Sequence, residues 1–332
     1  MGLRGLARSA AARAPLLEVL ARSAYFRTIA ARRATRRSAT SATTTPRIPS
    51  TRALDALDSL AAAASLPLGG AGRTLLVHSS FDAISLGTES PKDVLRALLE
   101  RCGAGTLAMP AIPMYREFPD DGRDLREAPP TCDYDPRRTP PWTGLLPFTL
   151  MRTAHATRSL HPLNSMAALG PDADAMMRHN LDGREPTPHG TGSSWEHCYR
   201  NDATVVFLGA EPVDSMTIIH VAEDLAIERG IWPIEDWYRR RPFRLHRDGG
   251  VETIVVRERQ PRYRIHFAEQ ALDHALRSNG ILVSRSVDGV PIAASSARAI
   301  VDLLLSRAAS GFPFAHLGLR GLLSPPTPPE SA

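Results

Sequence analysis

Strands and helices alternate along the chain from about residue 51. Apolar residues recur at helical spacing in two segments and form short uninterrupted runs in two others. The predicted elements are a helix over 52–64, a strand over 74–78, a helix over 92–101 and a strand over 106–109. Ser90 and Pro91 mark the start of the second helix, because serine is favoured at the N-cap and proline in the first turn. This strand–helix–strand unit implies a parallel strand pair with helices packed on the sheet.

The same alternation continues toward the C-terminus. Further strands are predicted over 203–209 and 251–256, and further helices over 145–151, 172–179, 217–228, 267–277 and 295–306. Residues 111–143 contain many prolines and charges and are predicted to be irregular, and a loop of this length is usually functional or disordered. The fold class we expect is α/β, with a mixed, largely parallel sheet flanked by helices.

The composition is that of a globular protein without a membrane span. Apolar residues make up 43% of the 332 residues, which is enough for a packed core. No apolar run reaches the roughly 18–20 residues that a membrane-spanning helix needs. The cysteines Cys102, Cys132 and Cys198 are far apart and form no CxxC pair. They indicate buried apolar side chains in a reducing compartment such as the cytoplasm.

The positive charge of the chain lies in its N-terminal segment. Residues 1–52 hold eleven arginines and one acid, Glu18, whereas the whole chain has a formal net charge of +5, so residues 53–332 carry −5. An acidic folded part argues against a nucleic-acid-binding enzyme and is compatible with a cationic substrate. The Arg-rich, Ser-rich start is either a mitochondrial transit peptide or a disordered extension. The domain organisation we expect is a basic extension over 1–50, one α/β domain over 51–322 and a Pro-rich tail over 323–332.

A histidine near the start of a predicted helix is the first candidate for chemistry. His220 lies three residues before Glu223, so on a helix the two side chains face the same side and can touch. The preceding strand ends at Gly209, and a short polar loop leads into the helix, an arrangement that presents a side chain at a sheet edge. Histidine moves protons near neutral pH, so His220 is a candidate general base.

Two further histidines lie in motifs with hydroxyl groups. His78, Ser79 and Ser80 end a predicted buried strand, where hydroxyls and backbone N–H groups can hold a phosphate, an amide or a thioester oxygen. His161 precedes a proline in a segment that ends at Ser165, and the proline fixes the backbone, which suits the wall of a pocket. Taken alone, each motif also fits a simple turn or a helix cap.

Together these motifs resemble the aminoglycoside 3-N-acetyltransferase family. The similar segments are Val77-His78-Ser79-Ser80, Arg158-Ser159-Leu160-His161-Pro162 to Ser165, and Thr217-Ile218-Ile219-His220-Val221-Ala222-Glu223, in the family's order. Weaker matches are Asp135-Pro136 with Thr139-Pro140, and Gly190-Thr191-Gly192-Ser193-Ser194. The resemblance implies an α/β sandwich peculiar to this family, and transfer of an acetyl group from acetyl-CoA to an amine.

The resemblance also assigns roles to residues of this chain. His220 is the expected base, its carboxylate partner is Glu269 in the segment Phe267-Ala268-Glu269, and Glu223 is the local alternative. The residues expected at the acetyl-CoA site are His78, Ser79, Ser80, Gly87 and Ser90. Those expected at the substrate pocket are His161, Ser165, Asp135, Thr139, Trp232 and Asp236.

The segment after the His220 helix leaves two interpretations open. Trp232 and Trp237 can stack on sugar rings while Asp236 holds an ammonium group, or they are packing anchors of the fold. The arginine run over 239–241 does not suit a polycation site and is expected to form a solvated surface.

Two other functions remain as alternatives. A metal-dependent hydrolase would use His78, His161 and His220 as ligands, but His-x-x-Glu suits a di-metal helical site only with a second such motif, which the sequence lacks. A catalytically silent homologue would bind CoA without turnover. We expect direct transfer to an amine of an aminoglycoside or amino sugar, with no metal, and the sequence leaves the identity of that amine open.

Overall fold

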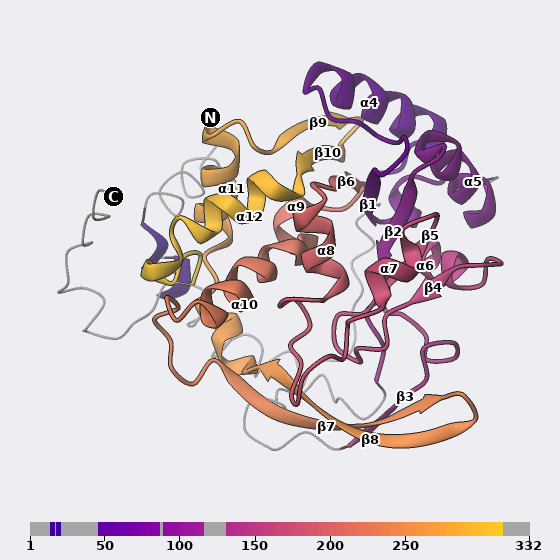
Figure 1. Cartoon of the computed structure of the whole chain (residues 1–332). Helices are drawn as coiled ribbons and strands as arrows, with labels where there is room; N and C mark the ends of the chain where they lie inside the picture. The colour runs from indigo at the N-terminus through magenta and orange to yellow at the C-terminus, as the bar shows by residue number, and fades with distance from the viewer. Residues whose placement is uncertain (1–13, 17, 21–45, 87–88, 116–130, 315–332) are drawn as a thin grey trace, which may run out of the picture.

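A seven-stranded sheet runs through the centre of the computed structural model, which describes residues 14–16, 18–20, 46–86, 89–115 and 131–314 (Figure 1). Its strand order is β4 (Thr157–Arg158), β5 (Met166–Leu169), β2 (Thr106–Pro110), β1 (Thr74–Ser79), β6 (Thr204–Leu208), β10 (Val290–Ser296) and β9 (Val283–Val287). β1 is parallel to both β2 and β6, whereas the outer pairs on each side are antiparallel. The mixed α/β fold is confirmed, with its parallel part confined to the three central strands.

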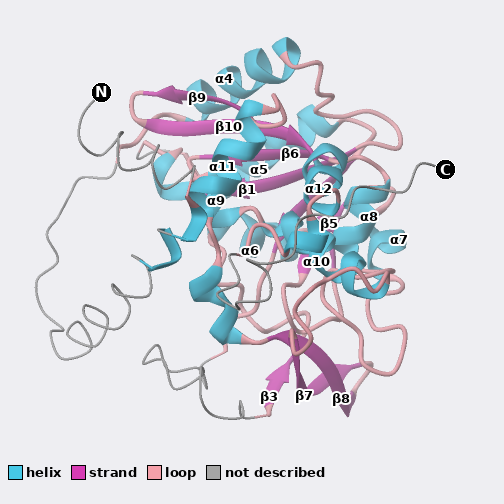
Figure 2. Ribbon diagram, turned by 90° about the vertical axis from the view of Figure 1, so that its left-hand side faces the viewer, coloured by secondary structure: helices cyan, strands magenta, loops and turns pink. Residues whose placement is uncertain are grey.

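Helices cover both faces of this sheet because its central strands are apolar on both sides. Leu75 and Val77 of β1 face one layer, which consists of α4 (Ser50–Ala63), α5 (Pro91–Cys102) and α6 (Leu145–Met151). Leu76 faces the other layer, which consists of α7 (Ala173–Met177), α8 (Ser194–Arg200), α10 (His220–Glu228), α11 (Glu269–Ser278) and α12 (Ala297–Leu305). Figure 2 shows helices both in front of the strands and behind them. The candidate base His220 therefore begins a helix of the second layer.

A second, three-stranded sheet lies below the main one in Figure 1. It consists of β3 (Cys132–Tyr134), β7 (Tyr238–Arg247) and β8 (Gly250–Arg259); β7 and β8 form a long hairpin, and β3 is parallel to β7. β3 lies inside the segment that the sequence predicts to be irregular. Its own sequence carries no strand pattern, and parallel pairing with β7 gives it its extended structure. The arginine run was expected to be solvated, but it lies in β7, where Arg241 is 2% exposed and forms an ion pair with Glu258.

Most of the predicted elements are confirmed to within a few residues. Ser90 caps α5, since its side chain accepts a hydrogen bond from the Asp93 backbone N–H and the Asp93 carboxylate accepts one in return. The predicted helix over 217–228 is a 3₁₀ turn followed by α10. The short helices are α9 (Pro212–Ser215) and the 3₁₀ turns η2 (Phe81–Ala83), η4 (Thr217–Ile219), η5 (Pro261–His266) and η6 (Ala308–Ser310). No helix in the described ranges is long and apolar enough to cross a membrane.

Part of the predicted N-terminal extension packs against the domain. Residues 18–20 are helical and the Val19 side chain is fully buried. Both carboxylate oxygens of Glu18 lie 3.1 Å from the backbone N of Gln270, in the first turn of α11. An acid at this place satisfies a free N–H and complements the helix dipole. The folded part of the chain thus includes residues before 50, while 21–45 and the tail over 323–332 lie outside the described residues.

Docking of this segment can be tested with two neighbouring substitutions. Val19→Asp places a carboxylate at a fully buried position and should lower the free energy of unfolding by about 1.5–3 kcal/mol, the worth of burying such a side chain. Leu20→Asp is the matched control, because the Leu20 side chain is 53% exposed. Chemical denaturation of the full chain measures both. Equal stability of the two variants would show that the segment does not pack on the domain.

Candidate active site

The chain enters the site through a tight connection after β6. Gly209 follows the strand with φ +69°, and a side chain there would meet the Cβ of Ala83 at 2.7 Å, so only glycine fits without strain. α9 and the 3₁₀ turn Thr217–Ile219 then lead directly into α10, whose first residue is His220. His220 is therefore presented near the carboxyl end of β6, beside the parallel strand β1. This is the edge at which open α/β sheets usually bind ligands.

His220 forms a buried pair with Glu223. The His220 Nδ1 lies 2.7 Å from Oε1 of Glu223, and the two side chains are 17% and 3% exposed. Burial lowers the pKa of His220 well below its usual range and raises the pKa of Glu223 to about 8. Because the two groups share one hydrogen bond, they titrate as one unit. The geometry favours Glu223 over Glu269, the partner that the family resemblance assigns to His220.

Glu269 belongs to a different helix from His220. It is the first residue of α11, which packs on α9, and within the described residues it forms no hydrogen bond or ion pair with His220. The segment Phe267-Ala268-Glu269 stands at the position along the chain that the family resemblance indicates. The position along the chain, however, does not determine which carboxylate lies beside the His220 imidazole.

A second histidine and an arginine also contact His220. The His189 ring centroid lies 5.1 Å from that of His220, and Nη1 of Arg259 lies 3.2 Å from the His220 Nδ1. His189 is 4% exposed and burial lowers its pKa well below the usual range. Its Nε2 lies 3.0 Å from Nδ2 of Asn164. Since an amide NH₂ only donates, this contact makes His189 Nε2 the acceptor and leaves the proton on Nδ1.

A hydrogen-bonded carboxylate lies behind His189. Asp224 Oδ2 accepts a hydrogen bond from the His189 backbone N–H at 3.0 Å, and its Oδ1 accepts one from the Tyr238 hydroxyl. Burial raises the pKa of Asp224 to about 7, against these hydrogen bonds, which favour the carboxylate. Tyr238 belongs to β7, so this contact joins the second sheet to the helix that carries His220.

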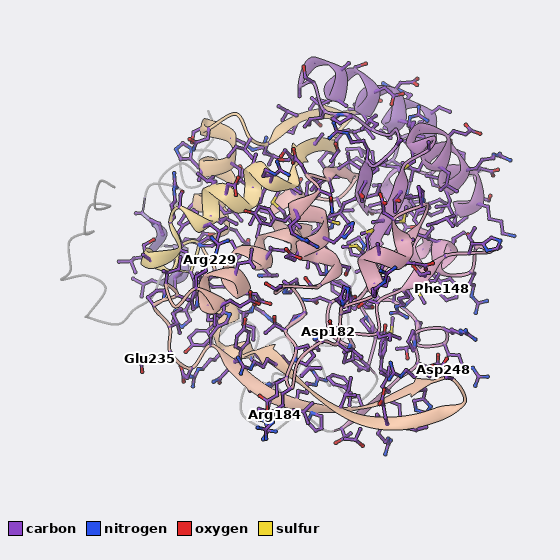
Figure 3. All side chains as sticks on the ribbon, viewed as in Figure 1. Phe148, Asp182, Arg184, Arg229, Glu235 and Asp248 are labelled. Carbon is purple, nitrogen blue, oxygen red and sulfur yellow. The ribbon has the colours of Figure 1, made fainter. Side chains whose placement is uncertain are left out.

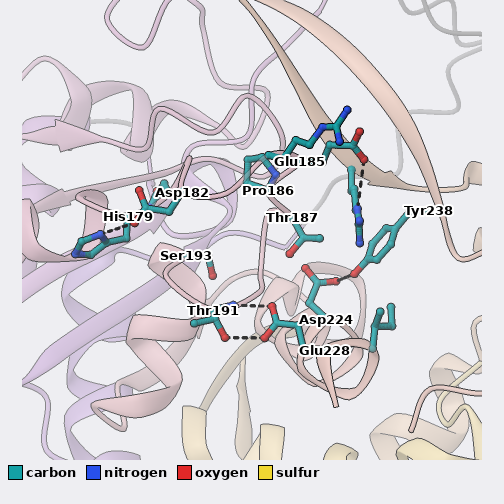
Figure 4. Close-up of a pocket in the computed structure, with 14 residues that line it drawn as sticks. His179, Asp182, Glu185, Pro186, Thr187, Thr191, Ser193, Asp224, Glu228 and Tyr238 are labelled. Carbon is teal, nitrogen blue, oxygen red and sulfur yellow. Dashed lines mark hydrogen bonds and ion pairs between the residues drawn. The ribbon is translucent and has the colours of Figure 1, made fainter. Parts of the chain in front are cut away.

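A polar cavity of about 410 Å³ lies on the other side of Asp224 (Figure 4). α10 contributes Asp224, Ile227 and Glu228 to its wall, and the segment before α8 contributes most of the rest. Asp182 and Arg184, both labelled in Figure 3, lie on this segment between the helices and the β7–β8 hairpin. Its acidic residues are Asp182, Glu185, Asp224 and Glu228, and its arginines are Arg184 and Arg257. Glu185 is paired with Arg240 and Arg257, so Asp182 and Glu228 are the acids of this wall that suit a cationic ligand.

His161 holds one wall of this cavity in place. Its Nδ1 accepts a hydrogen bond from the Leu163 backbone N–H at 3.2 Å, and its Nε2 lies 3.2 Å from the carbonyl oxygen of Pro186. The same carbonyl accepts a hydrogen bond from the backbone N–H of Arg257 in β8. Burial lowers the pKa of His161 to about 4, so the ring is neutral and able to accept on one nitrogen and donate on the other.

The other residues expected at the substrate pocket are engaged in local structure. Ser165 is fully buried, donates to the Ala111 carbonyl at 2.6 Å and accepts from Arg158. The Asp135 backbone N–H donates to the Thr139 hydroxyl, and the Thr139 carbonyl accepts from Arg158. Arg158 therefore ties the 135–139 turn to β5 and to the segment after β2.

The tryptophan segment packs as a cluster rather than lining the cavity. Trp237 is 1% exposed and contacts Trp232, Tyr263 and Phe314. The Asp236 carboxylate is exposed and bonds to the Tyr263 hydroxyl. Of the two interpretations left open by the sequence, the structure supports packing anchors.

The residues expected at the acetyl-CoA site divide into two groups. Ser79 and Ser80 are half-buried at the end of β1, and their hydroxyls have no hydrogen-bond partner among the described residues. The backbone N–H of Ser80, however, already donates to the Leu208 carbonyl at 2.9 Å. His78 is 4% exposed and stacks on Phe207 at 5.0 Å, and burial lowers its pKa to about 3. Ser90 caps α5, and Gly87 lies outside the described residues.

The histidines that a metal-dependent hydrolase requires do not form a ligand set. Within the part of the chain that the structure describes, no group of three His, Cys, Asp or Glu side chains could hold a metal ion. His161 bonds to backbone groups on both ring nitrogens, and His220 is paired with Glu223.

Sequence reasoning missed His189, Arg259, Asp224 and Tyr238. His189 stands directly before Gly190-Thr191-Gly192. The family resemblance at this segment lies in the glycines, and it gave no role to the histidine. Arg259 ends a strand of alternating pattern and has no local signal, because its partners lie in another element.

A family model and curated relatives of this chain point to the same family. A family model described as aminoglycoside 3-N-acetyltransferase matches residues 76–307. The chain is 33% identical over 240 residues to aminoglycoside N(3)-acetyltransferase III of Serratia marcescens, covering 70% of this chain and 80% of that protein. It is 36% identical over 164 residues to aminoglycoside N(3)-acetyltransferase IX of Micromonospora chalcea, a match that spans 47% of this chain and only 57% of that relative's length.

A solved structure agrees with this match at the level of the fold. The AAC-IIIb enzyme in its binary complex with CoASH superposes with a TM-score of 0.62 at 20% identity, covering 81% of this chain and 98% of that one. The same architecture is therefore present in an enzyme of that name. On the sequence match and the motifs around His220, this chain belongs to the aminoglycoside 3-N-acetyltransferase family.

Proposed function

We propose that this chain transfers an acetyl group from acetyl-CoA to an amine of an aminoglycoside or amino sugar, with His220 as the general base. The observation that carries the proposal is the 2.7 Å contact between His220 Nδ1 and Glu223, at the carboxyl end of a parallel strand. A related structure is named as a complex with CoASH, and others as complexes with a gentamicin and with apramycin. Those names support acetyl-CoA and an aminoglycoside as the two substrates.

The pair sets the direction of proton transfer. When the Nδ1–H group of His220 donates its hydrogen bond to the Glu223 carboxylate, the lone pair of His220 Nε2 is free to take a proton from the attacking amine. The amine nitrogen forms a bond to the thioester carbon, the C–S bond breaks, and the proton held by His220 passes to the departing thiolate. No acetyl-enzyme forms in this direct transfer, and the step needs no metal.

The thioester oxygen needs donors as negative charge develops on it. The half-buried hydroxyls of Ser79 and Ser80 lie at the end of β1, next to β6 in the sheet, and are available for this role. The backbone N–H of Ser80 is excluded, because it is already paired with Leu208.

The acidic cavity beside α10 supports a cationic acceptor. It lies next to Asp224, which follows Glu223 in the chain and contacts His189 behind His220. An amino sugar with several ammonium groups can place one of them near Asp182 and Glu228, which line this cavity. The silent CoA-binding alternative predicts no turnover with any amine.

The base and its partner are tested together. His220→Ala should lower kcat by about 100-fold or more, the usual worth of a general base, while the variant stays folded by circular dichroism. Glu223→Gln should give a smaller loss and a lower midpoint of the pH profile, because an adjacent anion favours the imidazolium. Glu269→Gln is the matched control and should retain most activity. A large loss in that control, with an active Glu223→Gln variant, would restore Glu269 as the partner.

The acceptor is tested with a panel of amines in an acetyl-CoA consumption assay. Gentamicin, simple amino sugars, nucleotide-linked amino sugars and polyamines cover the range of charge. We expect the best acceptor to be a cationic amino sugar, with sequential initial-rate kinetics and a kcat/KM that falls as ionic strength rises. A ping-pong pattern would remove direct transfer. Preference for an anionic nucleotide-linked sugar would count against capture by the acidic cavity.

A further inference from the structure

Arg259 places a positive charge against both members of the His220–Glu223 pair. Its Nη1 lies 3.2 Å from Nδ1 and 3.5 Å from Nε2 of His220, and 3.7 Å from Oε2 of Glu223. The guanidinium thus lies alongside the imidazole and touches the carboxylate oxygen that His220 does not use.

Two aromatic rings hold this guanidinium. Its carbon lies 5.4 Å from the centroid of the Phe314 ring and 5.9 Å from that of Trp237, and both rings are nearly fully buried. Stacking over aromatic faces favours a guanidinium and limits its motion. Arg259 also ends β8, where it is paired in register with Tyr238 of β7, so the backbone that carries it is fixed.

The other charged and titratable groups around His220 come from α10, from the segment before α8 and from β7. Glu223 comes from the same helix, His189 from the segment before α8, and Asp224 with Tyr238 lies behind His189. His189 is neutral, because burial lowers its pKa. Among the described residues, the permanent cation in contact with the pair is therefore Arg259.

Arg259 opposes protonation of the His220–Glu223 pair whichever of the two side chains takes the proton. Adding one proton to the unit makes it more positive, whether the proton sits on His220 or on Glu223. A fixed cation within 4 Å opposes that step in either case, and Arg259 lowers the pKa of both groups. Burial alone favours a protonated Glu223, which would donate to Nδ1 and leave Nε2 carrying a proton.

We propose that Arg259 is a positioning residue that opposes protonation of the His220–Glu223 pair and so extends toward lower pH the range in which the pair is unprotonated and base-competent. This inference rests on the proposed function, because it concerns the same base. The charge also favours a neutral amine over an ammonium ion at Nε2, and it favours release of the proton from His220 to the departing thiolate. Arg259 thereby acts on both proton transfers through the pair that it contacts.

The test separates charge from packing by two substitutions. Arg259→Met removes the charge and keeps an apolar chain against Trp237 and Phe314, whereas Arg259→Lys keeps the charge. Histidine ¹⁵N NMR of the full chain, with the His220 signal assigned from a His220→Gln variant, gives the midpoint of its titration. Arg247→Met is the matched control, because Arg247 lies at the far end of the same hairpin and pairs with Glu252.

We expect Arg259→Met to raise the His220 midpoint by about one pH unit or more, while Arg259→Lys and Arg247→Met stay near the wild-type value. The acid limb of kcat/KM for gentamicin should move by the same amount, so that activity falls about tenfold below the midpoint and recovers above it. An unchanged or lowered midpoint in folded Arg259→Met overturns the proposal. So does an equal rise in Arg259→Lys, because the charge is then not the cause.

The NMR titration needs no turnover, so the two proposals can fail separately. A raised midpoint in Arg259→Met with no acetyl transfer to any amine supports the electrostatic role and rejects the proposed function. Normal transfer with an unchanged midpoint and an unshifted acid limb supports the function and rejects the role of Arg259.

Discussion

The hydrogen bond between His220 and Glu223 is the interaction on which the rest of the site depends. It requires two residues three apart on one helix, and that helix must begin at His220 so that the imidazole reaches the edge of the sheet. The tight turn at Gly209 passes close to Ala83 and leads the chain from β6 through α9 to the start of this helix. Because Glu223 is almost fully buried, each polar group near it needs a partner, and this need shapes the surrounding contacts.

Those contacts link parts of the chain that are far apart in sequence. The second sheet reaches the helical layer through Tyr238, which bonds to Asp224, and through Arg257, whose backbone N–H bonds to Pro186. His161 fixes the same proline carbonyl from the other side. The site is thus assembled where the hairpin meets the helices on one face of the main sheet, and polar contacts join the two.

The sequence predicted what depends on local pattern and missed what depends on pairing across the fold. Buried runs such as 74–78 and the cap at Ser90 identify β1 and α5, because the signals lie within a few residues. β9 has an exposed polar centre and β4 is two residues long, so neither carries a periodic signal. His220 and Glu223 were found by their spacing. His189 and Arg259 were not, because their roles arise from contacts across 31 and 39 positions.

The carboxylate of Glu18 has a consequence for any processing of the chain. It accepts from the backbone N–H of Gln270 at the start of α11, and Val19 beside it is fully buried. Cleavage between Leu20 and Ile48 would separate both residues from the enzyme, leaving the backbone N–H of Gln270 without this acceptor. The shortened form would then be the less stable of the two.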